Sequence, residues 1–144
     1  MLKNLDPILS APLLAALKEM GHGDEIAVVD TNFPAYAMNG RVLHMPGIAA
    51  TRVVEAILSL MPLDTFVAAP AATMAQVDGK GPPAIFAEFQ AACDEAEGRE
   101  IKVEEIDRFA FYERVKKCYA LVHSGERRLY GNILLKKGVI GPDA

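Results

Sequence analysis

Cysteine is scarce in this sequence, which contains only Cys93 and Cys118 among its 144 residues. The two lie far apart, without a CxxC motif or a nearby histidine, so neither a disulfide framework nor a zinc site is indicated. Long basic runs are absent too, because lysine and arginine never occur in a run longer than a pair and the net charge is −4. Nucleic acid is therefore not expected as a partner, since binding its phosphate backbone requires a basic surface.

The chain also lacks a long hydrophobic run. The longest uncharged stretch, Thr65 to Val77, contains a proline and is much shorter than the roughly 20 residues that span a bilayer. The amino-terminal segment has Lys3, Asp6 and two prolines where a signal peptide would have a continuous apolar core. These features predict that the protein has no membrane partner and is cytoplasmic.

Apolar residues, in contrast, are plentiful. They make up 51% of the chain and the mean hydropathy is +0.16. This is high for a chain of this size, and it indicates that some apolar surface is covered between subunits. We therefore expect one domain, residues 1–144, that assembles into a homo-oligomer.

Hydrophobic periodicity and turn residues predict alternating strands and helices. We expect four helices, which begin at Ser10, Thr51, Pro82 and Arg108. Gly21 ends the first helix from its C′ position, and Gly98 ends the third. Strands are expected at 25–30, 41–45, 65–77 with an interruption at Pro70, 100–106, 119–125 and 132–140, and residues 31–40 are expected to form a loop. The fold class is therefore α/β: a single domain with a mostly parallel or mixed sheet and helices on both faces.

The stretch from Met20 to Asp30 is the first candidate for a functional site. His22 lies between two glycines, and the short apolar strand that follows ends on Asp30. Histidine can give and take protons near neutral pH, although in such a turn it can equally cap backbone groups. Asp30 lies at the carboxyl end of a strand, where ligands of α/β proteins gather, although a turn-capping role is the alternative.

Three separated stretches together resemble one family: GHGDEIAVVD, IDRFAFYERVKK and ERRLYGNILLKKGV. In this order and spacing they resemble the L-fucose mutarotase and D-ribose pyranase family, and its fucose branch in particular, from about Leu2 to Val139. The resemblance implies an enzyme that interconverts the α and β anomers of a free monosaccharide, with no metal or organic cofactor.

The resemblance also implies which residues act. The proton-transferring residue falls on His22, and the sugar-binding positions fall on Asp30, Arg108, Tyr130, Gly131 and Asn132. Members of the family form rings described as stacked pentamers, so a decamer is implied, with each active site completed across a subunit interface.

Several positions keep a second interpretation. Arg108 can instead form a surface ion pair with a neighbouring carboxylate, and Tyr130 and Asn132 can simply shape a turn. His44 and His123 lie in apolar strands and are expected to be satisfied core or edge residues. No role is assigned to Asn32, Tyr36, Tyr112, Lys136 and Lys137.

Two other functions also remain open. One is a D-ribose pyranase, and the other is a non-catalytic sugar-binding accessory of an uptake system, which would give His22 no task. L-fucose carries a methyl group at C5, which requires an apolar patch that Phe33, Tyr36 or Met38 could provide. The sequence does not choose among these sugars.

Overall fold

A single six-stranded mixed sheet organises the protein, whose computed structural model describes residues 1–144. The strand order is β2-β5-β1-β6-β3-β4, and only β6 runs antiparallel to its two neighbours. The strands are β1 (Glu25–Val29), β2 (Val42–Met45), β3 (Ala71–Met74), β4 (Val103–Ile106), β5 (Ala120–Ser124) and β6 (Ile133–Lys136). The prediction of a mixed α/β sheet is confirmed.

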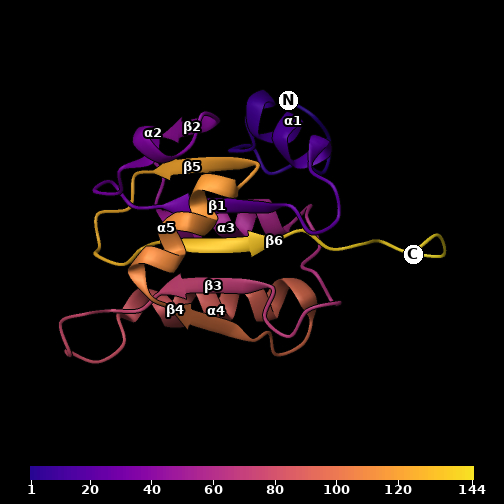
Figure 1. Ribbon diagram of the computed structural model, residues 1–144. Helices are drawn as coiled ribbons and strands as arrows, with labels where there is room; N and C mark the ends of the chain where they lie inside the picture. The colour runs from indigo at the N-terminus through magenta and orange to yellow at the C-terminus, as the bar shows by residue number, and fades with distance from the viewer.

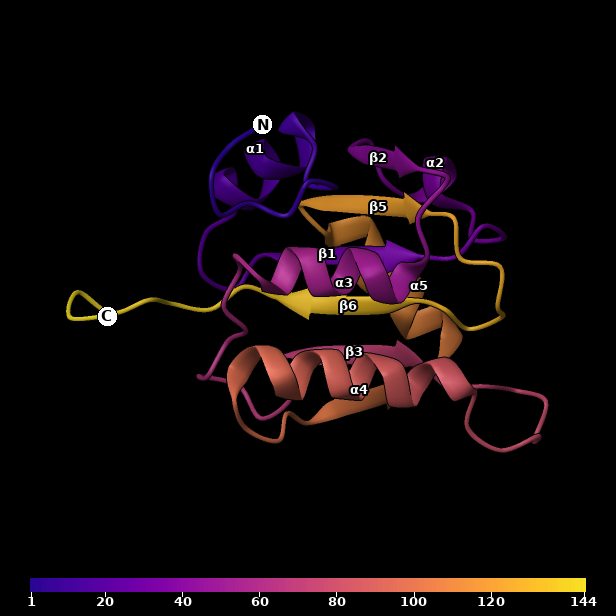
Figure 2. The same ribbon diagram turned by 180° about the vertical axis from the view of Figure 1, so that it is seen from behind.

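Helices cover both faces of the sheet, as expected. They are α1 (Ala11–Glu19), α2 (Ala35–Met38), α3 (Ala50–Leu58), α4 (Ala84–Glu97) and α5 (Arg108–Lys117). In Figure 1 α5 lies in front of the sheet, and the reverse view in Figure 2 brings α3 and α4 to the front. None of these helices is both long and apolar enough to cross a bilayer.

Local sequence explains three of the helix boundaries. The Ser10 hydroxyl accepts a hydrogen bond from Leu13 N at 3.3 Å, and Asp107 accepts from Phe109 N at 2.9 Å, so each caps the start of its helix. Gly98 ends α4 in the left-handed region, with φ of 68°. At the end of α1 the C-cap is Met20, with φ −59° and ψ 136°, and Gly21 has no left-handed φ. Gly21 directly follows the C-cap residue, so the predicted C′ position is confirmed, although without a left-handed φ.

Two expectations need correction. The segment 31–40, expected as a loop, contains the short helix α2, whose Ala35 is buried. The expected strand 65–77 is a strand only from Ala71 to Met74. Its first half bends away because Asp64 accepts a hydrogen bond from Phe66 N at 3.1 Å, which forms a tight local turn in place of a strand.

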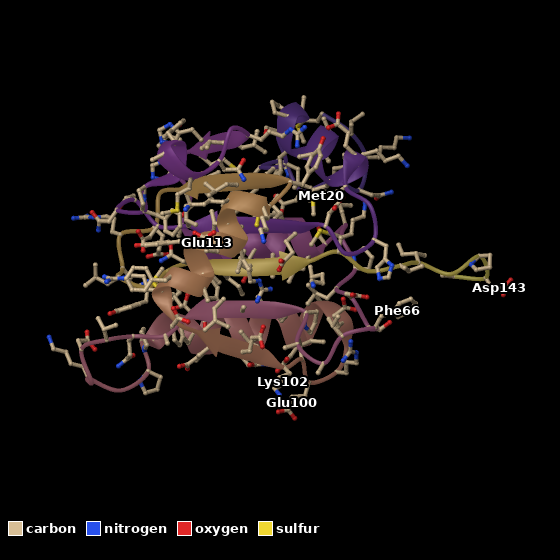
Figure 3. All side chains as sticks on the ribbon, in the orientation of Figure 1. Met20, Phe66, Glu100, Lys102, Glu113 and Asp143 are labelled. Carbon is tan, nitrogen blue, oxygen red and sulfur yellow. The ribbon has the colours of Figure 1, made fainter.

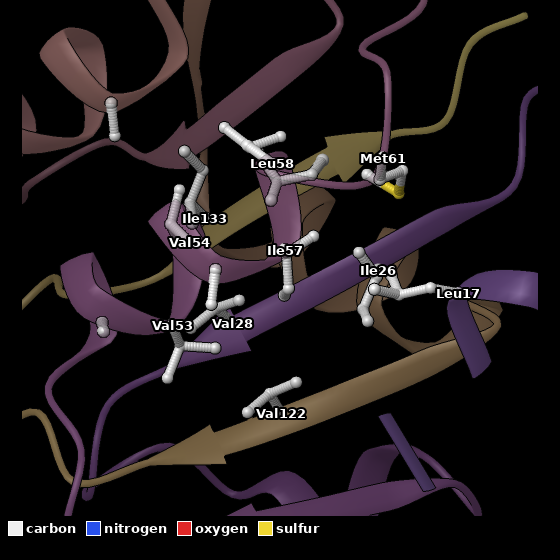
Figure 4. Close-up of a cluster of buried hydrophobic side chains, with 14 of the residues drawn as sticks. Leu17, Ile26, Val28, Val53, Val54, Ile57, Leu58, Met61, Val122 and Ile133 are labelled. Carbon is white, nitrogen blue, oxygen red and sulfur yellow. The ribbon is translucent and has the colours of Figure 1, made fainter. Parts of the chain in front are cut away.

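The core lies on both sides of β1, which is buried from Ile26 to Val29. On one face, α1, α3 and α4 bury Leu17, Ile57 and Phe89 against the sheet, and Figure 4 shows α3 packed across β1, β5 and β6. On the other face α5 and α2 cover a smaller apolar cluster that includes Phe111. With both faces buried, the inner strands β1, β3 and β6 are mostly apolar.

Candidate functional site

His22 lies in the turn between α1 and β1, at the amino-terminal end of that strand. Its Nε2 lies 3.0 Å from Oδ1 of Asp64, and Phe66 packs edge-on against the imidazole with ring centroids 4.8 Å apart. The His22 side chain is 41% exposed, whereas that of Asp64 is 3% exposed. Figure 3 shows Phe66 on the side of the sheet where β6 ends.

Strand pairing at the end of β6 brings His22 and Asp64 together from distant parts of the chain. Gly23 N donates to Lys137 O at 2.9 Å on one side, and Asp64 N donates to Lys136 O at 3.0 Å on the other. Lys137 Nζ also binds the carbonyls of Leu17 and Met20, which fixes the end of α1. The last residues of β6 therefore hold both segments in place.

The chemistry of Asp64 determines the state of the imidazole. Burial alone would raise the pKa of Asp64, but hydrogen bonds from Phe66 N and His22 outweigh it and hold that pKa below its usual value. An ionised carboxylate only accepts hydrogen bonds, so Nε2 of His22 carries the proton in the neutral ring. Nδ1 is then a free acceptor beside solvent, which is the arrangement of an oriented general base.

A second group of residues meets at the carboxyl end of β1. It surrounds a small cavity of about 210 Å³ lined by Asp30, Asn32, Phe33, Pro34, Met74, Tyr112, Leu129, Tyr130 and Asn132. Pockets for drug-sized ligands usually measure about 300–1,000 Å³. The cavity is therefore of a size suited to a small ligand, and it mixes apolar walls with a few polar groups.

Asp30 and Asn132 form a reciprocal pair at the bottom of this cavity. Asn132 Nδ2 donates to Asp30 Oδ2 at 3.0 Å, and Asp30 N donates to Asn132 Oδ1 at 2.8 Å. Both residues are 4% exposed, and burial raises the pKa of Asp30 although the hydrogen bonds from Asn32 N and Asn132 oppose that rise. Asn132 thus orients a carboxylate that can accept hydrogen bonds from ligand hydroxyls.

The turn that precedes β6 supplies the next wall. Tyr130 has a left-handed φ of 62°, rare for a side chain of its size, and its hydroxyl accepts a hydrogen bond from Val77 N at 3.1 Å. Gly131 has no room for a side chain, because a Cβ there would lie 2.6 Å from Cγ of Glu126. The predicted YGN positions therefore do lie together beside Asp30.

Arg108 is not among the residues that line the cavity. Its guanidinium is exposed and lies over the ring of Phe109, 5.0 Å from the centroid. Tyr112, one helical turn further along α5, lines the cavity instead. Arg108 therefore lies on the exposed surface, outside the cavity lining.

The structure separates the predicted site residues into two places. Each of the five residues of β1 advances the strand by about 3.3 Å, so β1 alone keeps His22 more than about 13 Å from Asp30. His22 and Asp30 cannot act on one sugar within a single chain. Any site that uses both needs two copies.

Sequence analysis missed Asp64, Phe66 and Met74. Asp64 is 42 positions from His22, and no local spacing signals such a pairing. Met74 ends an apolar strand and looked like core. No group of three or more histidine, cysteine or carboxylate side chains that could hold a metal ion is present.

His44 and His123 form a separate cluster at the edge of the sheet. Their rings stack with centroids 5.1 Å apart, and Tyr36 packs edge-on against both. Both ring nitrogens of His123 are buried without a hydrogen-bond partner. The expectation of a satisfied histidine is wrong for His123.

Comparison with known proteins identifies the family of the chain. Residues 3–140 match the RbsD / FucU transport protein family. The chain belongs to this family. It is 43% identical over 140 residues to a protein named L-fucose mutarotase from Actinobacillus pleuropneumoniae serotype 5b, covering 96% of this chain and 97% of that one.

Solved structures of the RbsD / FucU family have the same fold. The fucose mutarotase of Streptococcus pneumoniae, solved in complex with L-fucose, is 38% identical with a TM-score of 0.92, over 97% of this chain and 100% of that chain. Bacillus subtilis RbsD, solved with D-ribose, has a TM-score of 0.72 at 20% identity, over 98% of this chain and 100% of that chain, and shows a shared fold alone. The predicted family and its fucose branch are confirmed.

Proposed function

We propose that this protein is a cytoplasmic, cofactor-independent mutarotase, one domain over residues 1–144, that interconverts the α and β anomers of L-fucose or a closely related sugar. The observation that carries the proposal is the His22–Asp64 pair, which holds an imidazole with one free nitrogen at the surface. Full-length similarity to proteins named L-fucose mutarotase supports the same reaction.

In the proposed mechanism, Nδ1 of His22 accepts the proton of the anomeric hydroxyl as the C1–O5 bond breaks. The resulting imidazolium returns this proton to O5, which leaves the open-chain aldehyde. The aldehyde presents its other face, and the reverse transfers close the ring as the other anomer, so no proton or electron is gained or lost overall. General acid–base catalysis of this kind contributes about 10²–10⁴-fold.

Asp64 and Asp30 have different tasks in this scheme. Asp64 keeps the proton on Nε2 of His22 and stabilises the imidazolium, because an ionised acceptor forms the stronger hydrogen bond. Asp30, aligned by Asn132, accepts hydrogen bonds from sugar hydroxyls away from the reacting carbon. Tyr130 and Tyr112 flank the sugar ring, Gly131 gives the turn its close approach, and Arg108 contacts the sugar only from the rim.

The working site requires a second copy of the chain, because His22 and Asp30 lie at opposite ends of β1. Exposed apolar side chains occur at both ends, with Phe66 and Ile140 on the His22 side and Val77 and Leu129 on the cavity side. Burial of one set against the other would hide this surface. Contacts between unlike surfaces of identical chains form a ring where the rotation between copies closes, so we propose a ring-shaped homo-oligomer, with a decamer as the expected size.

The apolar wall of the cavity favours a deoxy sugar. Phe33 and Met74 both line the cavity, so they are placed to contact the C5 methyl group of L-fucose. Tyr36 and Met38, the other two candidates from the sequence, are not among the lining residues. A D-ribose pyranase would have no methyl group to place there, and a sugar-binding accessory would leave the His22–Asp64 pair without a task.

The decisive experiment is magnetisation-transfer NMR on the anomeric protons of L-fucose, with D-ribose as the competing substrate. Catalytic amounts of protein should accelerate exchange between the α and β signals, and His22→Ala should remove most of that acceleration while sugar still binds. Binding of L-fucose with no acceleration would contradict a mutarotase and favour the accessory. Faster exchange with D-ribose than with L-fucose would favour the pyranase.

A further inference from the structure

The turn that carries Tyr130 to the cavity rests on a buried carboxylate that does not line it. Glu126 is 4% exposed, and its Cγ occupies the space against which Gly131 packs, as a Cβ at that glycine would lie 2.6 Å away. Tyr130 keeps its left-handed φ of 62° just before this glycine. An unfavourable backbone conformation of this kind persists only where the surroundings hold it.

Glu126 connects both walls of the cavity. Its backbone oxygen accepts a hydrogen bond from Thr31 N at 2.9 Å, one residue beyond Asp30. Its carboxylate accepts from Ala50 N at 3.3 Å, at the start of α3, where the N-cap residue offers no side-chain acceptor. Glu126 therefore fixes the turn relative to both the Asp30 segment and the helix layer.

Arg128 completes the connection from the other side. Its backbone N and its Nε donate to Oε1 of Glu126 at 3.0 Å and 2.9 Å, and its Nη2 donates to Glu88 Oε1 on α4 at 3.0 Å. Nη1 of Arg128 binds the second oxygen of Glu88, and Thr51 on α3 donates to the same carboxylate at 2.8 Å. The guanidinium thus binds the turn directly to α4 and, through Glu88, to α3.

We propose that Glu126 and Arg128 are positioning residues that hold the turn 127–131 so that Tyr130 and Asn132 face the sugar. Neither side chain lines the cavity, so both act through the residues that do. This inference rests on the proposed function for its effect on the sugar, but the geometry of the turn can be tested without any sugar.

The first test compares Arg128→Ala with Arg52→Ala. Arg52, on α3, is a matched control, because its guanidinium also binds a carboxylate, donating two hydrogen bonds of 2.6 and 2.7 Å to Asp6, and it does not line the cavity. Arg128→Ala should raise the half-saturating L-fucose concentration about tenfold, the equivalent of one hydrogen bond. The saturated exchange rate and its pH profile should stay unchanged, because His22 is untouched.

Glu88→Gln is the second variant, since it weakens the hold on Arg128 without placing an uncharged group in the buried Glu126 site. Glu88→Gln should also raise the half-saturating L-fucose concentration. Arg128→Lys should recover part of the affinity that Arg128→Ala loses. Unchanged half-saturation in both Arg128→Ala and Glu88→Gln would overturn the proposal. So would an equal rise in Arg52→Ala, which would indicate a general effect of lost stability.

Hydrogen exchange read by mass spectrometry separates this proposal from the mutarotase proposal. Asn132 N donates to Tyr130 O at 2.8 Å, so amides in 127–132 should exchange faster in Arg128→Ala without sugar and stay unchanged in Arg52→Ala. Exchange as slow as in the wild type would refute positioning even if the protein is a mutarotase. Faster hydrogen exchange in Arg128→Ala, together with a wild-type protein that shows no mutarotase activity, would leave positioning supported and refute the proposed reaction alone.

Discussion

A mixture of two inactive variants should regain activity if each site is shared between two copies. His22→Ala removes the proposed base at one end of β1, and Asp30→Ala removes the proposed sugar-binding carboxylate at the other. In a homo-oligomer of either variant alone every site is defective. In a mixed oligomer, some sites combine an intact His22 from one copy with an intact Asp30 from the other.

The size of the recovery follows from the geometry. Since β1 keeps the two residues more than about 13 Å apart, each site draws them from different copies. With equal, random mixing each residue is intact in about half of its positions, so about a quarter of the sites should be intact in the mixed ring. Co-expression with two different affinity tags, purified in sequence, ensures that the measured oligomers contain both chains.

The assay is magnetisation transfer between the anomeric protons of L-fucose. The matched control combines His22→Ala with Asp64→Ala, because these residues bind each other at 3.0 Å within one chain and neither variant can supply what the other lacks. This pair should show no recovery. Co-expressed His22→Ala and Asp30→Ala that remain as inactive as the single variants would refute a site shared between copies.

Three further results are expected. Asp64→Asn should slow anomer exchange about tenfold. A hydrogen bond to a charged group is worth about 1.5–3 kcal/mol, and the partial exposure of His22 places the lost free energy at the lower end of that range. A wild-type rate in the same NMR assay would argue that Asp64 does not orient His22. Gly131→Ala should lower the free energy of unfolding by about 1–3 kcal/mol through overpacking. Gly47→Ala should not, because a Cβ added at Gly47 would meet open space. Urea denaturation compares the stability of the two variants. Burial raises the pKa of Asp30, so the contribution of this group to stability is present below its unfolded-state pKa and is lost as pH rises through its folded-state pKa. Asp30→Asn should therefore be more stable than the wild type only above that pH range. Thermal melts across pH test this.

Sequence patterns predicted the fold well where a segment buries one face or carries its own boundary signals. Asp107 marks the start of α5 because its side chain accepts a backbone hydrogen bond, and Gly98 marks the end of α4 because the absence of a Cβ allows its left-handed φ. The short helix α2 was missed because one turn of four residues has almost no periodicity to read, and its stability comes from burying Ala35 against the rest of the protein.

The candidate site was predicted in its members but not in its layout. Asp30 and the YGN turn meet because strands β1 and β6 are neighbours, a pairing that the sequence does not encode locally. The partner of His22 was missed for the same reason, since Asp64 reaches it only through the end of β6. Arg108 was placed by resemblance alone, and its distance from the cavity lining depends on the orientation of α5.

The position of β6 has a consequence for how the chain folds during synthesis. It is the last strand in the sequence, yet it lies between β1 and β3 and is the only link between the two halves of the sheet. While the ribosome is still making residues 133–136, the earlier strands therefore present two open edges, which are sites for aggregation. Because the turn 127–131 immediately precedes β6, the cavity beside Asp30 and the continuous sheet form in the same late step, so the cavity is complete only once the two open edges are closed.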